Sequence, residues 1–224
     1  MSARTLTIKK NVLGANAKSA EINRQLLDTH NILMINIMSA SGSGKTSLIL
    51  QTINRLKDKY RIAVIKGDIA SSIDADRIAR QNIPAVPVNT TGGCHLDALM
   101  IKTALDSLDL DRIDLIFIEN VGNLVCTADF DLGAHKKVVI LSIPEGDDKP
   151  HKYPVMFVEA DVVLVNKTDV LPYFDFNLEE FPALISGLNP SAGIFPVSAK
   201  TQDGLNRWIS WIEETFPGVS NEDS

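Results

Sequence analysis

The sequence has few cysteines and no long hydrophobic run, and each shortage excludes a class of protein. Two cysteines in 224 residues are too few for the disulfide framework of a small secreted domain, so we expect both to be reduced thiols. The longest apolar runs, such as residues 32–38, have the length of a strand and fall far below the roughly 20 residues that cross a bilayer. The N-terminal residues lack the apolar core of a secretion signal. We therefore expect a cytoplasmic protein with no membrane partner.

Basic residues are also in the minority. Lys and Arg number 22 against 28 Asp and Glu, which gives a formal net charge of −6. Binding to the phosphate backbone of a nucleic acid needs clustered Lys and Arg, and the sequence shows no such cluster. A nucleic-acid partner is therefore not expected. The length and the 45% hydrophobic content suit one α/β domain with a sizeable core.

Short β-branched segments alternate with segments of helical period from residue 32 onward. This alternation is typical of parallel strands joined by crossover helices. We therefore predict an α/β fold with a mostly parallel sheet of about seven strands and helices on both faces. The expected strands are residues 32–38, 62–66, 85–88, 115–119, 138–142, 162–166 and 194–197.

The remaining periodic segments predict helices and set the expected domain limits. Leu48, Ile49, Ile53 and Leu56 recur at helical spacing, as do the apolar residues between 96 and 108, Leu99 among them. Residues 206–216 are expected to form a last helix whose tryptophans pack in the core. Residues 1–30 are expected to form an N-terminal helical extension, with a helix over about 15–27. Residues 31–216 would then be the main domain and residues 217–224 a flexible tail.

An apolar segment, a Gly-rich turn and a helical segment follow one another in INIMSASGSGKTS, the order that a phosphate-binding loop requires. Gly42 and Gly44 allow the backbone to curl, so that its N–H groups and the positive end of the helix face the phosphates. Lys45 adds a positive charge, and Thr46 offers a hydroxyl to Mg²⁺. Ser39 stands where the pattern G-x-x-x-x-G-K-[ST] has its first glycine. The expected nucleotide-binding residues here are Ser41, Gly42, Ser43, Gly44, Lys45, Thr46 and Ser47.

Two further motifs follow expected strands, at the edge where doubly wound sheets bind ligands. Residues 166–169 read NKTD and resemble the N-K-x-D element of GTPases, and residues 198–200 resemble their S-A-K element. The Asp169 carboxylate would accept hydrogen bonds from two guanine N–H donors that adenine does not present, so GTP should be preferred over ATP. Together with the phosphate loop, these motifs predict the fold of a P-loop NTPase, with residues 31–216 as the P-loop GTPase domain. The alternative is an aspartate that only caps a turn. The expected base-binding residues are Asn166, Lys167, Asp169, Ser198, Ala199 and Lys200.

Acidic residues near two other strand ends are candidates for the catalytic centre. Asp68 and Asp74 could hold Mg²⁺ or its waters, although Asp74 could equally cap the helix that follows it. Glu119 stands where nucleotide-hydrolysing P-loop proteins have an acid, and Gly122 could donate its N–H to the γ-phosphate and rearrange when that group leaves. No residue is evident as a water-positioning group, so we expect slow intrinsic turnover. The expected catalytic residues are Lys45, Asp68, Asp74, Glu119 and Gly122, with Thr46 and Asp68 as Mg²⁺ ligands.

Cys94, His95 and Cys126 form a candidate metal site. Two thiolates and one imidazole make a soft ligand set that suits Ni²⁺, Zn²⁺ or Cu⁺. The alternative is that the cysteines are small buried side chains without a ligand role. Three ligands per chain leave a coordination gap, which a two-fold dimer could fill with thiols from both copies.

The sequence resembles the HypB family of hydrogenase nickel-incorporation GTPases over about residues 23–211. ENVGNLVC and EGDDKPHKYP are typical of that family rather than of GTPases in general. The resemblance implies a Mg²⁺-dependent GTPase that dimerises when nucleotide is bound. It also implies nickel or zinc at Cys94, His95 and Cys126, and a role in loading nickel into [NiFe]-hydrogenase. The motifs that carry the resemblance are GSGKT, GDIASSIDADR, TTGGCHLDA, IENVGNLVCTADFDLG, PEGDDKPHKYP, NKTD and SAKTQDGL.

The resemblance further implies partners, namely other hydrogenase maturation proteins and the hydrogenase large subunit. It implies that Lys149, in the EGDDKP loop, approaches a nucleotide held by the other subunit. The first thirty residues contain no cysteine cluster or histidine tract of the kind that some relatives use for tight nickel binding. Transient metal transfer is therefore expected rather than nickel storage.

Three rival functions make different demands on the sequence. A urease-type nickel GTPase would be expected to carry Cys-Pro-His, whereas residues 94–96 read Cys-His-Leu. A small-molecule P-loop kinase has no reason to carry NKTD. A non-catalytic metal-binding scaffold would need only the three metal ligands, and a measurement of phosphate release separates it from an enzyme.

Overall fold

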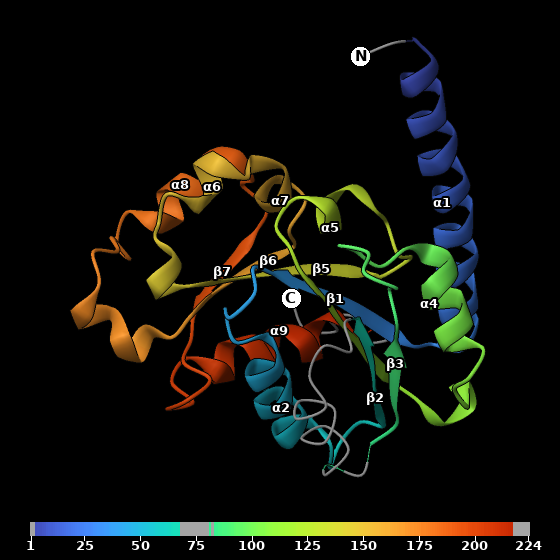
Figure 1. The fold of residues 1–224 in the computed structure, drawn as a ribbon. Helices are drawn as coiled ribbons and strands as arrows, with labels where there is room; N and C mark the ends of the chain where they lie inside the picture. Colours follow the sequence, from blue (N-terminus) through green and yellow to red (C-terminus); the bar gives the residue numbers. More distant parts are fainter. Residues whose placement is uncertain (1–2, 68–80, 82, 217–224) are drawn as a thin grey trace, which may run out of the picture.

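The computed structural model describes residues 3–67, 81 and 83–216 (Figure 1). Seven strands form one sheet in the order β3-β2-β4-β1-β5-β6-β7, and every pair of neighbours is parallel. The predicted α/β fold of a P-loop NTPase is therefore confirmed. The strands are β1 (Leu33–Ser39), β2 (Ile62–Gly67), β3 (Ala85–Val88), β4 (Leu115–Gly122), β5 (Lys136–Ser142), β6 (Val162–Asn166) and β7 (Gly193–Pro196).

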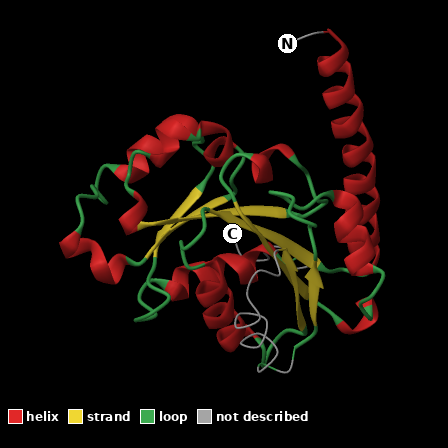
Figure 2. Cartoon of the chain, in the orientation of Figure 1, coloured by secondary structure: helices red, strands yellow, loops and turns green. Residues whose placement is uncertain are grey.

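Helices cover both faces of the sheet (Figures 1 and 2). On one face, α2 and α9 pack on the central strands, and Trp208 is fully buried there, as predicted. On the other face lie α1 and α4, together with α5 to α8. No helix among the described residues is both long enough and apolar enough to cross a bilayer. The helices are α1 (Ala3–Thr29), α2 (Lys45–Leu56), α4 (Ala98–Leu105), α5 (Cys126–Asp129), α6 (Lys149–Lys152), α7 (Pro154–Val158), α8 (Phe181–Leu188) and α9 (Leu205–Thr215).

Several observed boundaries differ from the predicted ones. The N-terminal helix begins at Ala3 and not near residue 15. The α4 helix begins only at Ala98, because the Asp97 side chain caps it by accepting a hydrogen bond from the N–H of Met100. Leu99 is 62% exposed and does not join the core as its spacing suggested. The expected tail over residues 217–224 lies outside the described residues.

Acidic residues just before two strands tie the amino ends of neighbouring strands together. Asp114, before β4, accepts hydrogen bonds from the guanidinium and the N–H of Arg61, at the start of β2. The hydrogen bonds from Arg61 are the main reason that the pKa of Asp114 lies below its ordinary value. Asp161, before β6, likewise binds the N–H of Lys137 and the ammonium of Lys136 at the start of β5. These contacts lie at the amino ends of the strands. The loops of the candidate site extend from the opposite, carboxyl ends.

Candidate functional site

The turn between β1 and α2 has the backbone shape that a phosphate-binding loop requires. Gly42 and Gly44 both have positive φ values, of 79° and 99°, in the left-handed region that favours glycine. A Cβ on Gly44 would lie 2.5 Å from Nδ2 of Asn166, so this position also has no room for a side chain. The α2 helix begins at Lys45, so its positive end faces the loop.

Ser39, the departure from the usual pattern, is fully buried beneath this loop. Its hydroxyl donates to the Ala40 carbonyl (2.7 Å) and accepts from the Ser43 hydroxyl and the Lys45 ammonium (2.7 Å). The Lys45 ammonium also donates to the Ala40 carbonyl at 3.3 Å. The serine is thus accommodated by hydrogen bonds within the loop, and the Lys45 side chain lies along it.

The expected base-binding residues converge on the phosphate loop. The Asn166 amide donates to the Ser43 carbonyl (2.9 Å) and accepts from the N–H of Ala199 (3.1 Å). The Lys167 ammonium donates to the Gly42 carbonyl at 2.7 Å. The Asp169 side chain, 14% exposed, accepts from the Ser198 hydroxyl at 2.6 Å. A single asparagine therefore connects the two expected base-binding segments to the loop.

A cavity of about 740 Å³ joins these segments. Its wall also includes α2 residues that the sequence analysis did not single out, among them Leu50, Gln51 and Asn54. Their spacing from Ser47 is that of one helix face, so the periodicity of α2 could have identified them. The residues that line the cavity are Gly44, Ser47, Leu50, Gln51, Asn54, Gln81, Asn166, Lys167, Asp169, Val170, Ala199 and Lys200.

The side chains of Thr46 and Glu119, which both carry oxygen atoms that can bind a metal, meet beside the phosphate loop. The Thr46 hydroxyl donates to a carboxylate oxygen of Glu119 at 2.6 Å. A hydroxyl and a carboxylate are hard oxygen ligands that fit Mg²⁺. The Lys66 ammonium lies 3.4 Å from both oxygens of Glu119, and both residues are buried, Lys66 at 8% exposure and Glu119 at 5%. Sequence analysis missed Lys66, which faces Glu119 because β2 and β4 pair these two residues.

Replacing Lys66 with Met should destabilise the protein by about 3–5 kcal/mol, because the Glu119 carboxylate would stay buried without its cation. Denaturant unfolding measures the change. Lys102→Met, which breaks a half-exposed pair with Asp106, should cost less than about 1 kcal/mol. Adding Glu119→Gln to Lys66→Met should recover part of the loss, since both charges are then gone. A loss below 1 kcal/mol in the single variant would contradict this account of the pair.

Gly122 lies directly against the phosphate loop. It was expected in a turn after the strand, but β4 continues through it, and an irregularity in the β1–β4 pairing places it opposite Ser39. A Cβ on Gly122 would lie 2.9 Å from the Cα of Ser41, so only glycine fits this contact. The other two acidic candidates, Asp68 and Asp74, lie outside the described residues.

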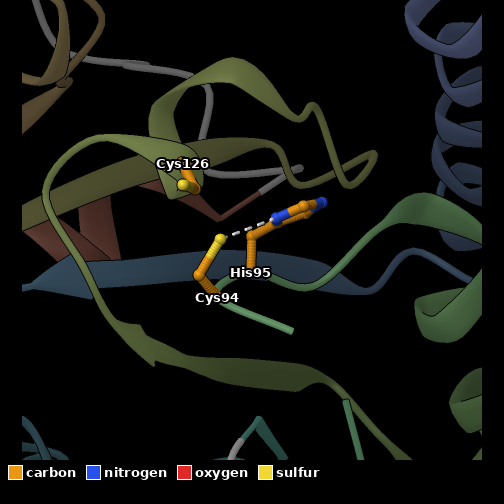
Figure 3. Close-up of side chains that lie close together, drawn as sticks. All are labelled: Cys94, His95 and Cys126. Atoms are coloured by element: carbon orange, nitrogen blue, oxygen red, sulfur yellow. Dashed lines mark hydrogen bonds between the residues drawn. The ribbon is translucent and has the colours of Figure 1, made fainter. Parts of the chain in front are cut away.

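The structure brings Cys94, His95 and Cys126 together, with their ligand atoms all within 4.8 Å of one another (Figure 3). The Cys94 sulfur lies 3.6 Å from Nδ1 of His95, and the His95 ring stacks on Phe130 with 3.8 Å between ring centroids. A hydrogen bond with Cys94, and then burial, raise the pKa of the Cys126 thiol. A bound metal would therefore have to displace a proton from Cys126. Within the described residues this is the only group of three such ligands.

Comparison with known proteins identifies the family. Residues 33–196 match the family described as "CobW/HypB/UreG, nucleotide-binding domain". The hydrogenase maturation factor HypB of Escherichia coli K12 is 47% identical over 210 residues, which cover 94% of this chain and 72% of that protein. The chain belongs to the HypB family.

Two solved HypB structures have the same fold as this HypB-family chain. HypB from Archaeoglobus fulgidus superposes with a TM-score of 0.86 at 38% identity, covering 92% of this chain and 100% of that one. HypB from Helicobacter pylori, solved in complex with nickel, gives 0.84 at 35% identity, with coverage of 92% and 99%. Membership of the HypB family supports nucleotide hydrolysis in general, and the sequence-based recognition of the family is confirmed.

Proposed function

We propose that this chain is a GTP-hydrolysing metallochaperone that holds Ni²⁺ or Zn²⁺ at Cys94, His95 and Cys126. In this proposal it assists nickel insertion into [NiFe]-hydrogenase in the cytoplasm. The observation that carries it is the convergence of these three ligand atoms within 4.8 Å, a few residues from a glycine that touches the phosphate loop. The HypB family membership supports the hydrogenase role.

The proposed GTPase chemistry depends on charge neutralisation rather than on a covalent intermediate. The loop N–H groups and the Lys45 ammonium would bind and stabilise the phosphates, and Asp169 would select guanine. Thr46 and Glu119 would hold Mg²⁺, which supplies positive charge to the phosphates when it is bound. Asp68 remains a further candidate for this ion.

A short segment connects the proposed γ-phosphate sensor to a metal ligand. Asn123 follows Gly122, and its side chain accepts hydrogen bonds from the N–H groups of Val125 (2.7 Å) and Cys126 (3.0 Å). Cys126 is also the first residue of α5. A rearrangement of Gly122 would therefore move the residue that orients the Cys126 backbone. We infer that hydrolysis and metal affinity are linked in both directions.

Nickel affinity should differ by at least about 5-fold between the GDP complex and the complex with a non-hydrolysable GTP analogue. Competition against a chromogenic chelator measures both values. Cys126→Ala should lose nickel binding at this site in both complexes and keep its nucleotide affinity. Equal nickel affinities in the wild-type protein would reject the linkage. Single-turnover phosphate release tests the enzyme itself, because a non-catalytic scaffold would release none.

The dimer and its partners belong to the same proposal. Three metal ligands per chain leave a position that a second copy could complete, so we propose a GTP-dependent homodimer. Lys149 begins α6, its ammonium lying 5.6 Å from the ring centroid of Tyr153, and we keep it as a candidate for contact with the nucleotide of the other subunit. The proposed protein partners are other maturation proteins and the hydrogenase large subunit.

A further inference from the structure

Helix α1 lies alongside α4, and its N-terminal part projects beyond the rest of the chain (Figure 1). The docked part of the helix is held by polar contacts as well as apolar ones. Near its C-terminal end, Asp28 lies 3.0 Å from Nε2 of His135, whose Nδ1 accepts from the N–H of Met34 in β1. The helix is thereby fixed to the sheet and does not only rest on α4.

Two asparagines on α1 each bind the same two segments of the domain. The Asn16 side chain accepts from the N–H of Ala98 (2.8 Å) and donates to the Asp131 carbonyl (2.7 Å). The Asn23 side chain donates to the Ala98 carbonyl (2.8 Å) and to the Leu132 carbonyl (3.0 Å). Because an amide carries both donors and an acceptor, it can bridge backbone groups that an apolar side chain would leave unsatisfied.

The asparagines bind the two segments that carry the metal ligands. Ala98 is the first residue of α4 and lies three residues after His95. Asp131 follows Phe130, whose ring stacks on that of His95, and both come shortly after α5, which begins at Cys126. The α1 helix therefore bridges the segment that follows Cys94 and His95 and the segment that follows Cys126.

The packing around Asn23 leaves little freedom for adjustment. Asn23 is fully buried, and its Oδ1 has no hydrogen-bond partner among the described residues. Burial of an unsatisfied oxygen is unfavourable, so the contribution of this side chain lies in its two donated bonds. A Cβ on Gly133 would lie 2.4 Å from the Ala20 carbonyl oxygen, which shows how closely the helix and the 131–134 segment approach.

We infer that α1 is a positioning element of the metal site, and that Asn16 and Asn23 set the distance between its two ligand-bearing segments. This inference rests on the proposed function, since it takes the Cys-His cluster as the metal site. Residues that orient the ligands of a metal without touching it are known to change metal affinity by about 10- to 100-fold.

Metal titrations of the full chain test the inference. Asn23→Leu removes both donated bonds while keeping the branched shape of the side chain, and Asn16→Ala removes the half-buried bridge. Each should weaken Ni²⁺ and Zn²⁺ binding about 10-fold or more and reduce the thiolate-to-nickel charge-transfer absorption. Affinity for a GTP analogue should stay within about twofold, which also reports whether the variants are folded. Gln25→Leu is the matched control, because it removes an amide from the exposed side of the same helix.

The outcomes separate this inference from the proposed function. Parental metal affinity and absorption in both asparagine variants, together with lost binding in Cys126→Ala, would overturn the role of α1 and leave the metal site in place. Parental metal binding in Cys126→Ala would instead overturn the site. If Asn23→Leu loses its affinity for the GTP analogue, it is not correctly folded, and the metal affinity of Asn16→Ala decides the result. A loss of metal affinity in Gln25→Leu equal to that in the asparagine variants would count against the inference.

Discussion

Asp169→Asn is expected to weaken GTP binding roughly 10³-fold and to create a preference for xanthosine triphosphate. Guanine presents two N–H donors, which match the two acceptor oxygens of a carboxylate. An asparagine presents one donor and one acceptor, which match the N1–H and the C2 carbonyl of xanthine. Asp169 suits this role because its side chain is mostly buried and lines the cavity beside the phosphate loop.

Equilibrium binding of labelled GTP and xanthosine triphosphate measures the change in base preference. The matched control is Asp175→Asn, which alters an exposed aspartate that does not line the cavity. It should leave both affinities at the wild-type values. An unchanged ratio of the two affinities in Asp169→Asn would remove this residue from the base site and would favour the capping role, for which its hydrogen bond with Ser198 already provides a partner.

Lys45→Ala is expected to lower the single-turnover rate of GTP hydrolysis by about 10²–10³-fold. The ammonium lies along the phosphate loop, where it donates to the Ser39 hydroxyl and the Ala40 carbonyl. In a site poor in water, a fixed positive charge stabilises the charge of the transferring phosphoryl group more than water does. Alanine also leaves the buried Ser39 hydroxyl with one donor fewer, without adding a clash.

Phosphate release at saturating GTP separates this loss of rate from weaker binding. Lys59→Ala, which removes an exposed ammonium paired with Glu213, should hydrolyse GTP at the wild-type rate. Wild-type turnover in Lys45→Ala would mean that the loop does not bind the phosphates as proposed. The nucleotide assignment would then need another site.

The strands were predictable because both faces of the sheet are covered. All seven residues of β1 are buried and five of them are apolar, so strands of this kind appear in the sequence as nearly continuous apolar runs. The loop motifs were predictable because each follows such a run directly. The last predicted strand shifted by one residue, from 194–197 to Gly193–Pro196, which lies within the usual uncertainty of strand ends.

The features that sequence analysis missed depend on contacts between distant segments. Lys66 and Glu119 are 53 residues apart and meet only because β2 neighbours β4, an order that periodicity does not reveal. The length of α1 was underestimated because its N-terminal part projects beyond the rest of the chain, where no packing partner among the described residues requires an apolar pattern. Gly122 was expected beyond the strand, since the bulge that extends β4 has no local signature.

Because all the strands run in the same direction, their carboxyl ends form one rim of the sheet and their amino ends form the opposite rim. The proposed nucleotide and metal sites lie at the carboxyl-end rim. The proposed ligand contacts come from the carboxyl ends of the strands and from the segments that follow them, whereas the opposite rim is bound together by Arg61 with Asp114 and by Lys136 with Asp161. A dye or an affinity handle attached at this opposite rim would therefore leave the loops that carry the nucleotide and metal contacts unmodified.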